Sequence, residues 1–122
     1  MTARSTGVLD LSSIRIAIAG LGAIGRKVAR ELTEGIPGLA LSAIATGNKA
    51  KAQAWLDREA IACPIISLDE LPVYSDLALE CAPAAILGDI CLPMLNAGKQ
   101  VMVLSASALL RWLVAGAGTI VS

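Results

Sequence analysis

Three glycines near the start of the chain have the spacing Gly-x-Gly-x-x-Gly, at Gly20, Gly22 and Gly25. They follow a strand-like aliphatic stretch and precede a helix-like stretch, the setting in which such a triplet binds a dinucleotide. The first permits a tight turn, the second lets a pyrophosphate approach, and the third lets the helix pack on the sheet. The helix N-terminus favours the diphosphate. We therefore expect NAD or NADP to contact Gly20, Leu21, Gly22, Ala23, Ile24 and Gly25.

The second strand of such a domain normally ends in an acidic residue that binds the ribose, about 20 residues after the glycines. This chain has Ala45-Thr46-Gly47-Asn48-Lys49 there, with no carboxylate. Thr46 or Asn48 could hydrogen-bond the ribose hydroxyls. Lys49 or Lys51 could pair with a 2′-phosphate, although both also suit a solvated helix face. The pattern slightly favours acceptance of NADP and leaves the choice between NAD and NADP open.

Ligands of doubly wound folds bind beyond the carboxyl ends of the strands. Cys81, Ala82 and Pro83 follow the expected fourth strand and Ser105 follows the fifth, so we expect them beside the nicotinamide. A purely structural turn is an equally good interpretation of Pro83. No catalytic residue is predicted, because the sequence contains no histidine and thiols and hydroxyls are poor general bases.

The three cysteines, Cys63, Cys81 and Cys91, indicate neither a metal site nor a disulfide framework. Their number is odd, their spacing matches no zinc pattern, and no histidine can complete a ligand set. Free cysteine behaves as a small hydrophobic residue. We therefore expect buried, reduced thiols in a cytoplasmic protein without a bound metal.

The elements that must position these residues alternate between strands and helices. Aliphatic runs and turn signals predict strands at 14–19, 39–46, 64–66, 77–81 and 100–104, and helices at 23–34, 49–58 and 83–96. Residues 69–74 are expected to form a turn or brief helical segment broken by Pro72, and Pro93 to kink the third helix. A short helix around 109–114 and a sixth strand from 119 complete the expected order.

Strands that alternate with helices through short loops predict an α/β fold, a Rossmann-type doubly wound parallel sheet in three layers, α/β/α. Hydrophobic residues make up 56% of the chain, and none is Phe. Aliphatic strands covered on both faces by alanine-rich helices give this bias. We expect residues 1–13 to be a flexible tail and residues 14–122 a single NAD(P)-binding domain, truncated before any second domain.

Charge and hydropathy restrict the partners. Ten basic and ten acidic residues leave no net charge, so nothing indicates a nucleic-acid partner. Residues 101–122 carry a single charge, Arg111, and about 20 apolar residues could span a bilayer. The arginine falls mid-segment, where it is costly in a membrane. We therefore expect no membrane partner and interpret the run as a buried strand followed by a short helix.

Several stretches together resemble the L-aspartate dehydrogenase family. Residues 16–26, Ile-Ala-Ile-Ala-Gly-Leu-Gly-Ala-Ile-Gly-Arg, resemble its opening, and Leu79-Glu80-Cys81-Ala82 resembles its segment after the fourth strand. Residues 103–109 resemble its Ser-Val-Gly-Ala-Leu segment, with Ser107 where glycine is usual. Residues 119–122 resemble the strand that leads into its catalytic domain. Many families share the glycine motif, so the resemblance rests on the combination.

The resemblance implies a cofactor domain for NAD(P)-dependent oxidation of L-aspartate to iminoaspartate, then oxaloacetate and ammonia. Members of the family add an α+β domain that carries the catalytic histidine and forms the dimer. Because this chain has no histidine, we expect it to be inactive alone. We expect it to bind cofactor through its glycine motif, and to self-associate because the face that packs on the second domain in the family would be open to water. The alternatives are a homoserine-dehydrogenase-like NAD-binding domain, a stand-alone nucleotide-binding or redox-sensing module without catalysis, and a non-functional remnant.

Overall fold

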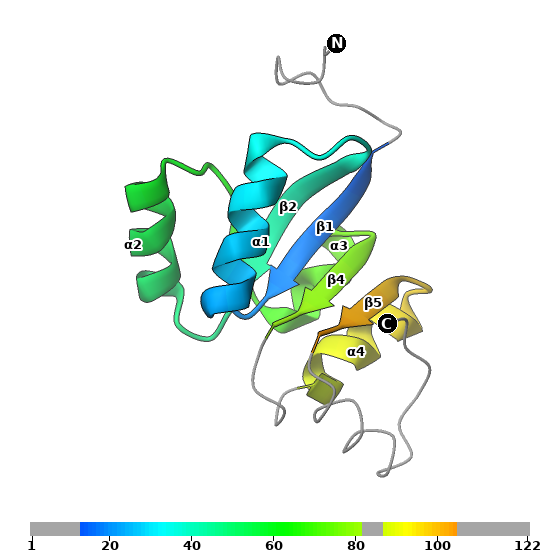
Figure 1. Cartoon of the computed structure of the whole chain (residues 1–122). Coiled ribbons are helices and arrows are strands. Elements are labelled where there is room, and N and C mark those ends of the chain that lie inside the picture. Colours follow the sequence, from blue (N-terminus) through cyan, green and yellow to red (C-terminus); the bar gives the residue numbers. More distant parts are fainter. Residues whose placement is uncertain (1–12, 82–86, 105–122) are drawn as a thin grey trace.

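The computed structural model describes residues 13–81 and 87–104, which form a five-stranded sheet flanked by helices (Figure 1). The strands are β1 (Ile14–Ala19), β2 (Leu39–Ala45), β3 (Ile65–Ile66), β4 (Leu77–Glu80) and β5 (Gln100–Val103). The helices are α1 (Ala23–Glu34), α2 (Lys49–Glu59), α3 (Leu71–Tyr74) and α4 (Leu87–Asn96), and a 3₁₀ helix (Leu68–Glu70) precedes α3. The five strands and the first two helices predicted from the sequence are confirmed, with ends that differ by one residue or not at all.

The described strands are all parallel and lie in the order β3-β2-β1-β4-β5. β1 pairs with β2 on one side and with β4 on the other, so the strand order reverses at β1. This reversal defines a doubly wound sheet, and ligands of such sheets bind at the carboxyl ends of the strands next to it. The predicted fold class is confirmed.

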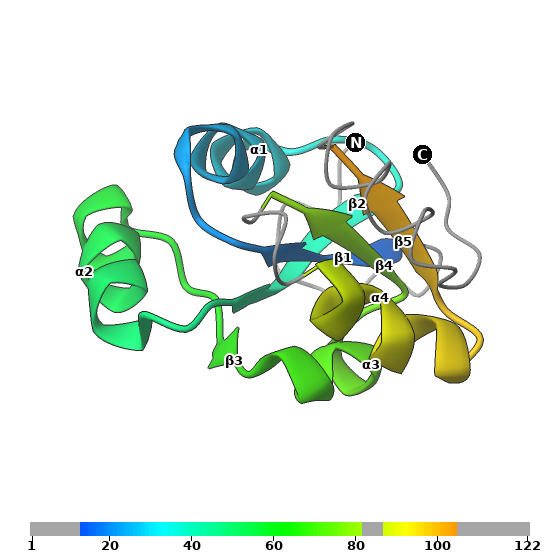
Figure 2. The same cartoon turned by 90° about the horizontal axis from the view of Figure 1, so that it is seen from below.

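Helices cover both faces of the sheet, which gives the three predicted layers (Figure 2). On one face, Ile18 of β1 and Ile44 of β2 pack with α1 and with Trp55 and Leu56 of α2. On the other face lie α3 and α4, and their side chains pack on alanines of the sheet. Those alanines, Ala17, Ala19, Ala43, Ala45 and Ala78, are fully buried. Their small side chains let α3 and α4 approach the sheet closely, which accounts for the aliphatic composition.

The residues of α1 that are buried differ from the apolar stripe predicted from its sequence. Ile24, Val28 and Leu32 recur every four residues, but the buried residues are Gly25, Ala29 and Leu32, and Ile24 is 59% exposed. The physical reason is the close approach of α1 to β1, which selects the smallest side chains for the contact rather than the most hydrophobic ones.

Proline has a different role in α3 from the one expected. The sequence predicted a segment broken by Pro72, but Pro72 lies in the first turn of α3. A proline is tolerated there because the first N–H groups of a helix have no intrahelical acceptor. Pro93 lies inside α4.

No helix in the described ranges is long and apolar enough to cross a membrane. Four predictions concern parts of the chain outside those ranges: the tail up to residue 12, the helix start at Pro83, the helix at 109–114 and the strand from 119.

Candidate functional site

The turn between β1 and α1 leaves a helix start open to an anion. Gly20 follows β1 with a φ of 99°, a left-handed conformation that favours glycine, and its N–H donates to the carbonyl oxygen of Ala45 at 2.9 Å. Gly22 is the N-cap of α1; no side chain of the described residues caps this helix, and its first turn has no acidic residue. The first N–H groups of a helix lack intrahelical acceptors, so this end can bind a phosphate.

Gly22 and Gly25 differ in what a side chain would meet at each position. A Cβ built on Gly22 has no atom within 4 Å, which leaves the space beside it available to a ligand. A Cβ on Gly25 would collide with the carbonyl oxygen of Gly20 and would lie 3.2 Å from Cγ2 of Ile18. The contrast fits the two roles expected of these glycines, close approach of a pyrophosphate and close packing of the helix.

Arg26 adds a positive charge at the same end of α1. Its N–H donates to the carbonyl oxygen of Gly22 at 2.9 Å, and its side-chain Nε is buried without a hydrogen-bond partner among the described residues. Helical side chains lean toward the N-terminus of their helix. Arg26 was not among the predicted site residues, although a basic side chain directly after the third glycine was a signal for it.

The segment after β2 presents the hydroxyl and amide expected near the ribose. Thr46 Oγ1 accepts a hydrogen bond from the N–H of Asn48 at 3.2 Å, and Asn48 Oδ1 caps α2 by accepting from the N–H of Lys51 at 3.1 Å. The hydroxyl of Thr46 and the amide NH₂ of Asn48 can still donate. Local hydrogen bonds thus fix both side chains and leave their donors available.

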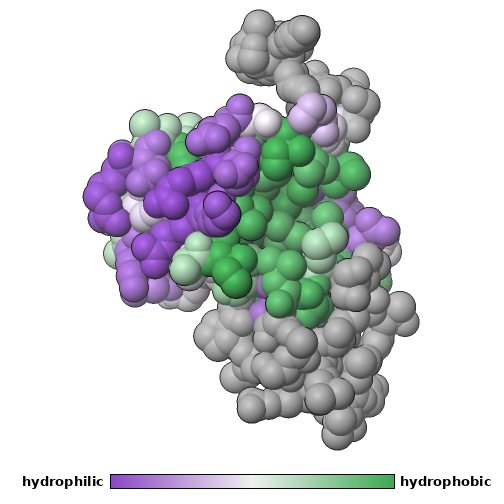
Figure 3. Space-filling view, viewed as in Figure 1, coloured by the Kyte–Doolittle hydropathy of each residue, from purple (hydrophilic) through white to green (hydrophobic). Residues whose placement is uncertain are grey.

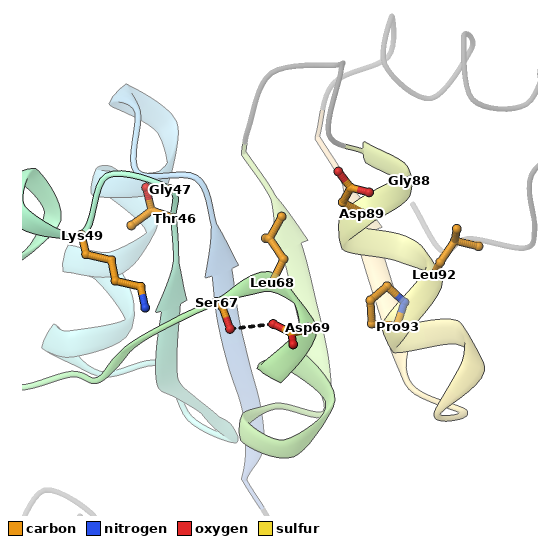
Figure 4. Close-up of a pocket in the computed structure, with 10 residues that line it drawn as sticks. All are labelled: Thr46, Gly47, Lys49, Ser67, Leu68, Asp69, Gly88, Asp89, Leu92 and Pro93. Atoms are coloured by element: carbon orange, nitrogen blue, oxygen red, sulfur yellow. Dashed lines mark hydrogen bonds between the residues drawn. The ribbon is translucent and has the colours of Figure 1, made fainter.

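A pocket of about 800 Å³ lies beside this segment (Figure 4). Its residues come from the segment between β2 and the start of α2, from the segment after β3 with its 3₁₀ helix, and from the first turns of α4: Thr46, Gly47, Lys49, Ser67, Leu68, Asp69, Gly88, Asp89, Leu92 and Pro93. Its volume falls in the range of small-molecule sites, about 300–1,000 Å³. Leu68, Leu92 and Pro93 give it the apolar lining that suits a planar ring.

The charges in the pocket are Lys49 on one side and Asp69 and Asp89 on the other. Ser67 Oγ lies 2.6 Å from Oδ1 of Asp69 and 2.9 Å from Oε1 of Glu70, and the N–H of Ser67 donates to the same Glu70 oxygen at 2.9 Å. These two bonds from Ser67, and to a smaller extent the charge of Lys49, hold the pKa of Glu70 below its ordinary value. The hydrogen bonds from Ser67 thus hold the side chains of Asp69 and Glu70 in place.

Thr46 was predicted at this site from the sequence, whereas the pocket residues after β3 and on α4 were not. A signal for the first group was available in the predicted fold class, because a doubly wound sheet places its third strand beside its second. β3 pairs with β2 in the register Ala45↔Ile66, so Ser67 comes directly after a strand end that lies beside Thr46. Nothing in the sequence marked the α4 residues, because their position depends on how that helix crosses the sheet.

Only one of the residues expected beside the nicotinamide lies in the described ranges. Cys81 follows β4, and its N–H donates to the carbonyl oxygen of Ala19 at 2.9 Å, which places it next to the glycine turn. Ala82, Pro83 and Ser105 lie outside the described residues.

The three thiols do not have the properties of nucleophiles. Burial raises the pKa of Cys63, Cys81 and Cys91 to about 11, and the charge of Glu80 contributes for the last two. The thiolate is the reactive form of cysteine, so these side chains stay protonated at neutral pH. In residues 13–81 and 87–104, no three His, Cys, Asp or Glu side chains are arranged to hold a metal ion.

Residues 20–114 match the sequence model of a known family, described as the NAD-binding domain of homoserine dehydrogenase. The chain belongs to this family of NAD-binding domains. The match begins at the first glycine of the turn and includes both the turn and the pocket beside β2.

Among individual proteins, the chain is similar to L-aspartate dehydrogenases. It is 41% identical over 98 residues to L-aspartate dehydrogenase 3 of Bordetella bronchiseptica, covering 80% of this chain and 36% of that one. It is also 41% identical over 99 residues to L-aspartate dehydrogenase of Bradyrhizobium diazoefficiens, covering 81% and 35%. The resemblance seen in the sequence is confirmed, and the chain spans about a third of the length of these relatives.

Solved structures with the same fold include two inositol dehydrogenases. Scyllo-inositol dehydrogenase from Lactobacillus casei, crystallised with NAD(H) and scyllo-inositol, has a TM-score of 0.63 and 22% identity over 81% of this chain and 31% of its own. Myo-inositol 2-dehydrogenase from Lactobacillus plantarum has a TM-score of 0.63 and 21% identity over 80% and 31%. At this identity the likeness concerns the fold alone.

Proposed function

We propose that this chain is the cofactor-binding domain of an NAD(P)-dependent oxidoreductase that acts on L-aspartate. The observation that carries the proposal is the β1–α1 turn, where a Cβ would clash at Gly25 but meets nothing at Gly22. The identity of 41% to two L-aspartate dehydrogenases supports the substrate. In this account the substrate-binding and catalytic groups belong to the part of such an enzyme that this chain does not match.

Different groups of the described residues would bind different parts of the cofactor. The pyrophosphate lies over Gly22 against the first N–H groups of α1 and near Arg26, since a helix start without a cap binds phosphate. The adenosine occupies the pocket, with Thr46 and Asn48 toward its ribose. When bound, the nicotinamide accepts the hydride from Cα of the substrate. The other residues that the sequence predicts at the cofactor also line its path in this proposal: Leu21, Ala23, Ile24, Cys81, Ala82, Pro83 and Ser105.

Both NAD and NADP are accepted in this account, because Thr46 stands where a carboxylate would repel a 2′-phosphate and Lys49 lines the same pocket. Thr46→Asp is therefore expected to lower the affinity for NADPH relative to NADH by about tenfold, the effect of a repulsion of about 1.4 kcal/mol. Thr46→Asn is the matched control, because it adds a polar group without charge. Titrations of both variants with the two reduced cofactors measure the ratio. An unchanged ratio in Thr46→Asp would show that the ribose does not lie beside Thr46.

The reaction proposed for the whole enzyme is a dehydrogenation at Cα. L-Aspartate loses a hydride to the nicotinamide and a proton from its amine, which gives iminoaspartate, and water converts this to oxaloacetate and ammonia. A homoserine-dehydrogenase-like domain is the second candidate, favoured by the description of the matching family. A chimaera in which this chain replaces the matching segment of the Bordetella bronchiseptica relative tests the proposal, by aspartate-dependent formation of reduced cofactor. A stand-alone nucleotide-binding module would give none.

The remaining proposals concern the chain as a whole. We propose that residues 14–122 form the domain, that residues 1–13 are a tail, and that the protein is cytoplasmic. The cytoplasmic location is supported by three free cysteines, two of them half-buried and one buried.

We also propose that the chain self-associates when it is produced alone. Apolar side chains gather over the sheet beside α1 (Figure 3), and Leu77 and Met102 there are only partly buried. Association would remove this apolar surface from water. Sedimentation at several protein concentrations should show a rising average mass, and a monomer at all concentrations would contradict the proposal.

A further inference from the structure

Glu80 is the one charged side chain among the described residues that is fully buried. It is the last residue of β4, so it lies at the carboxyl edge of the sheet, where doubly wound folds bind their ligands. In β4, Glu80 shares a face of the sheet with Ala78, and Leu79 lies on the opposite face. Ala78 packs in the cluster that includes the α4 residues Ile90, Cys91 and Met94. A carboxylate is thus fully buried on a face of the sheet that apolar side chains otherwise cover.

A buried carboxylate has a desolvation cost that an apolar side chain would not have. Burial of a charged group costs several kcal/mol, and replacement of buried ionic groups by apolar ones of similar volume is often neutral or stabilising. A buried carboxylate therefore depends on its hydrogen-bond partners. The hydrogen bonds of Glu80 indicate what it does there.

The side chain of Glu80 binds the backbone at the end of β5. Its Oε1 accepts from the N–H of Leu104 at 3.2 Å, and its carbonyl oxygen accepts from the same N–H at 3.3 Å. Glu80 pairs with Val103 in the β4–β5 ladder, so the carboxylate reinforces the last step of that ladder. It thereby holds the backbone of Leu104 at the end of β5.

This end of the sheet is where the second half of the cofactor has to lie. In the proposed function the glycine turn at β1 would hold the pyrophosphate, and the adenosine would lie in the pocket between the ends of β2 and β3 and the first turns of α4. The nicotinamide half then crosses to the other side, over the ends of β4 and β5. A nicotinamide carboxamide presents both a donor and an acceptor, and backbone groups bind such a ligand well only when their direction is fixed.

We propose that Glu80 is a positioning residue for the nicotinamide half of the cofactor, acting through the backbone at Leu104. The inference rests on the proposed function, because it requires that the chain bind a nicotinamide dinucleotide. It predicts that Glu80 affects the nicotinamide half and not the ADP-ribose half of the bound molecule.

The test compares NADH with ADP-ribose, which lacks the nicotinamide. Glu80→Met removes the acceptor at similar length and is expected to weaken NADH about tenfold, the order of one lost hydrogen bond, with ADP-ribose changed less than about twofold. Glu80→Gln keeps a side-chain oxygen and should retain most of the NADH affinity. Ser75→Ala is the matched control, since Ser75 is the other buried polar residue of the described chain and precedes β4 at the opposite edge of the sheet.

The inference would be overturned if Glu80→Met lowered the affinities for NADH and ADP-ribose equally. It would also be overturned if the folded variant bound NADH with unchanged affinity. A wild-type chain that binds ADP-ribose as tightly as NADH would contradict it too. If the folded wild-type chain binds neither ligand, it is the proposed function that fails. Should Glu80→Met not fold, the wild-type Leu104 amide resonance decides: it should shift with NAD and not with ADP-ribose, and equal shifts would contradict the proposal.

Discussion

Valine in place of Gly22 is expected to weaken the binding of NADH at least about 100-fold while the chain remains folded. A branched side chain at Gly22 would fill the space through which the pyrophosphate reaches the N–H groups of α1, but it would meet no protein atom at Cβ. Loss of two hydrogen bonds to a charged group, each worth about 1.5 kcal/mol, corresponds to about 100-fold in affinity. Fluorescence titration with NADH measures the effect, and circular dichroism verifies the fold.

Gly25→Ala is the matched control, because it changes the neighbouring glycine with the opposite result. Its Cβ would collide with the carbonyl oxygen of Gly20, so we expect it to lower the free energy of unfolding by about 1–3 kcal/mol, as overpacked cores do. Urea unfolding gives this value. The division of roles, with Gly22 for pyrophosphate approach and Gly25 for helix packing, would be contradicted if Gly22→Val bound NADH normally. It would also be contradicted if Gly22→Val did not fold.

The chain alone is expected to form no reduced cofactor from L-aspartate. Dehydrogenation needs a group that accepts the amine proton, and such general-base assistance raises the rate about 10²–10⁴-fold. The sequence contains no histidine to do this. The thiols are unsuitable because burial raises their pKa to about 11. The substrate must also be held against the nicotinamide, and the pocket described here lies on the adenosine side. Assays with aspartate and NAD or NADP measure the activity.

The chimaera with the Bordetella bronchiseptica relative is the positive control for that assay, since it supplies the part that this chain does not match. Aspartate-dependent reduction by the chimaera and none by the chain alone is the expected pair of results. Turnover by the chain alone within about tenfold of the relative, a barrier difference of only about 1.4 kcal/mol, would mean that this chain carries the catalytic groups.

The β1–α1 unit could be predicted from the sequence because each of its signals is local. The aliphatic run, the glycine spacing and the helical periodicity place β1 and α1 at Ile14–Ala19 and Ala23–Glu34, as expected. The buried stripe of α1 could not be predicted in the same way. It depends on the distance between helix and sheet, which favours Ala29 at the contact and leaves Ile24 exposed.

The pocket and the burial of Glu80 could not be predicted from local sequence signals. Asp69 and Asp89 are far apart in the sequence and line one pocket because β3 pairs beside β2 and α4 crosses the sheet behind them. Glu80 in a four-residue strand has no sequence signal for complete burial, because its environment is made by α4 and by the end of β5. Such features follow from tertiary packing, which cannot be predicted from the periodicity of a single segment.

The central claim, that this chain binds a nicotinamide dinucleotide at the β1–α1 turn, is tested most directly by titrating the purified full chain with NADH. The account predicts saturable enhancement of NADH fluorescence, displaced by ADP-ribose and absent in Gly22→Val. A chain shown to be folded by circular dichroism that binds neither NADH nor NADPH would contradict it.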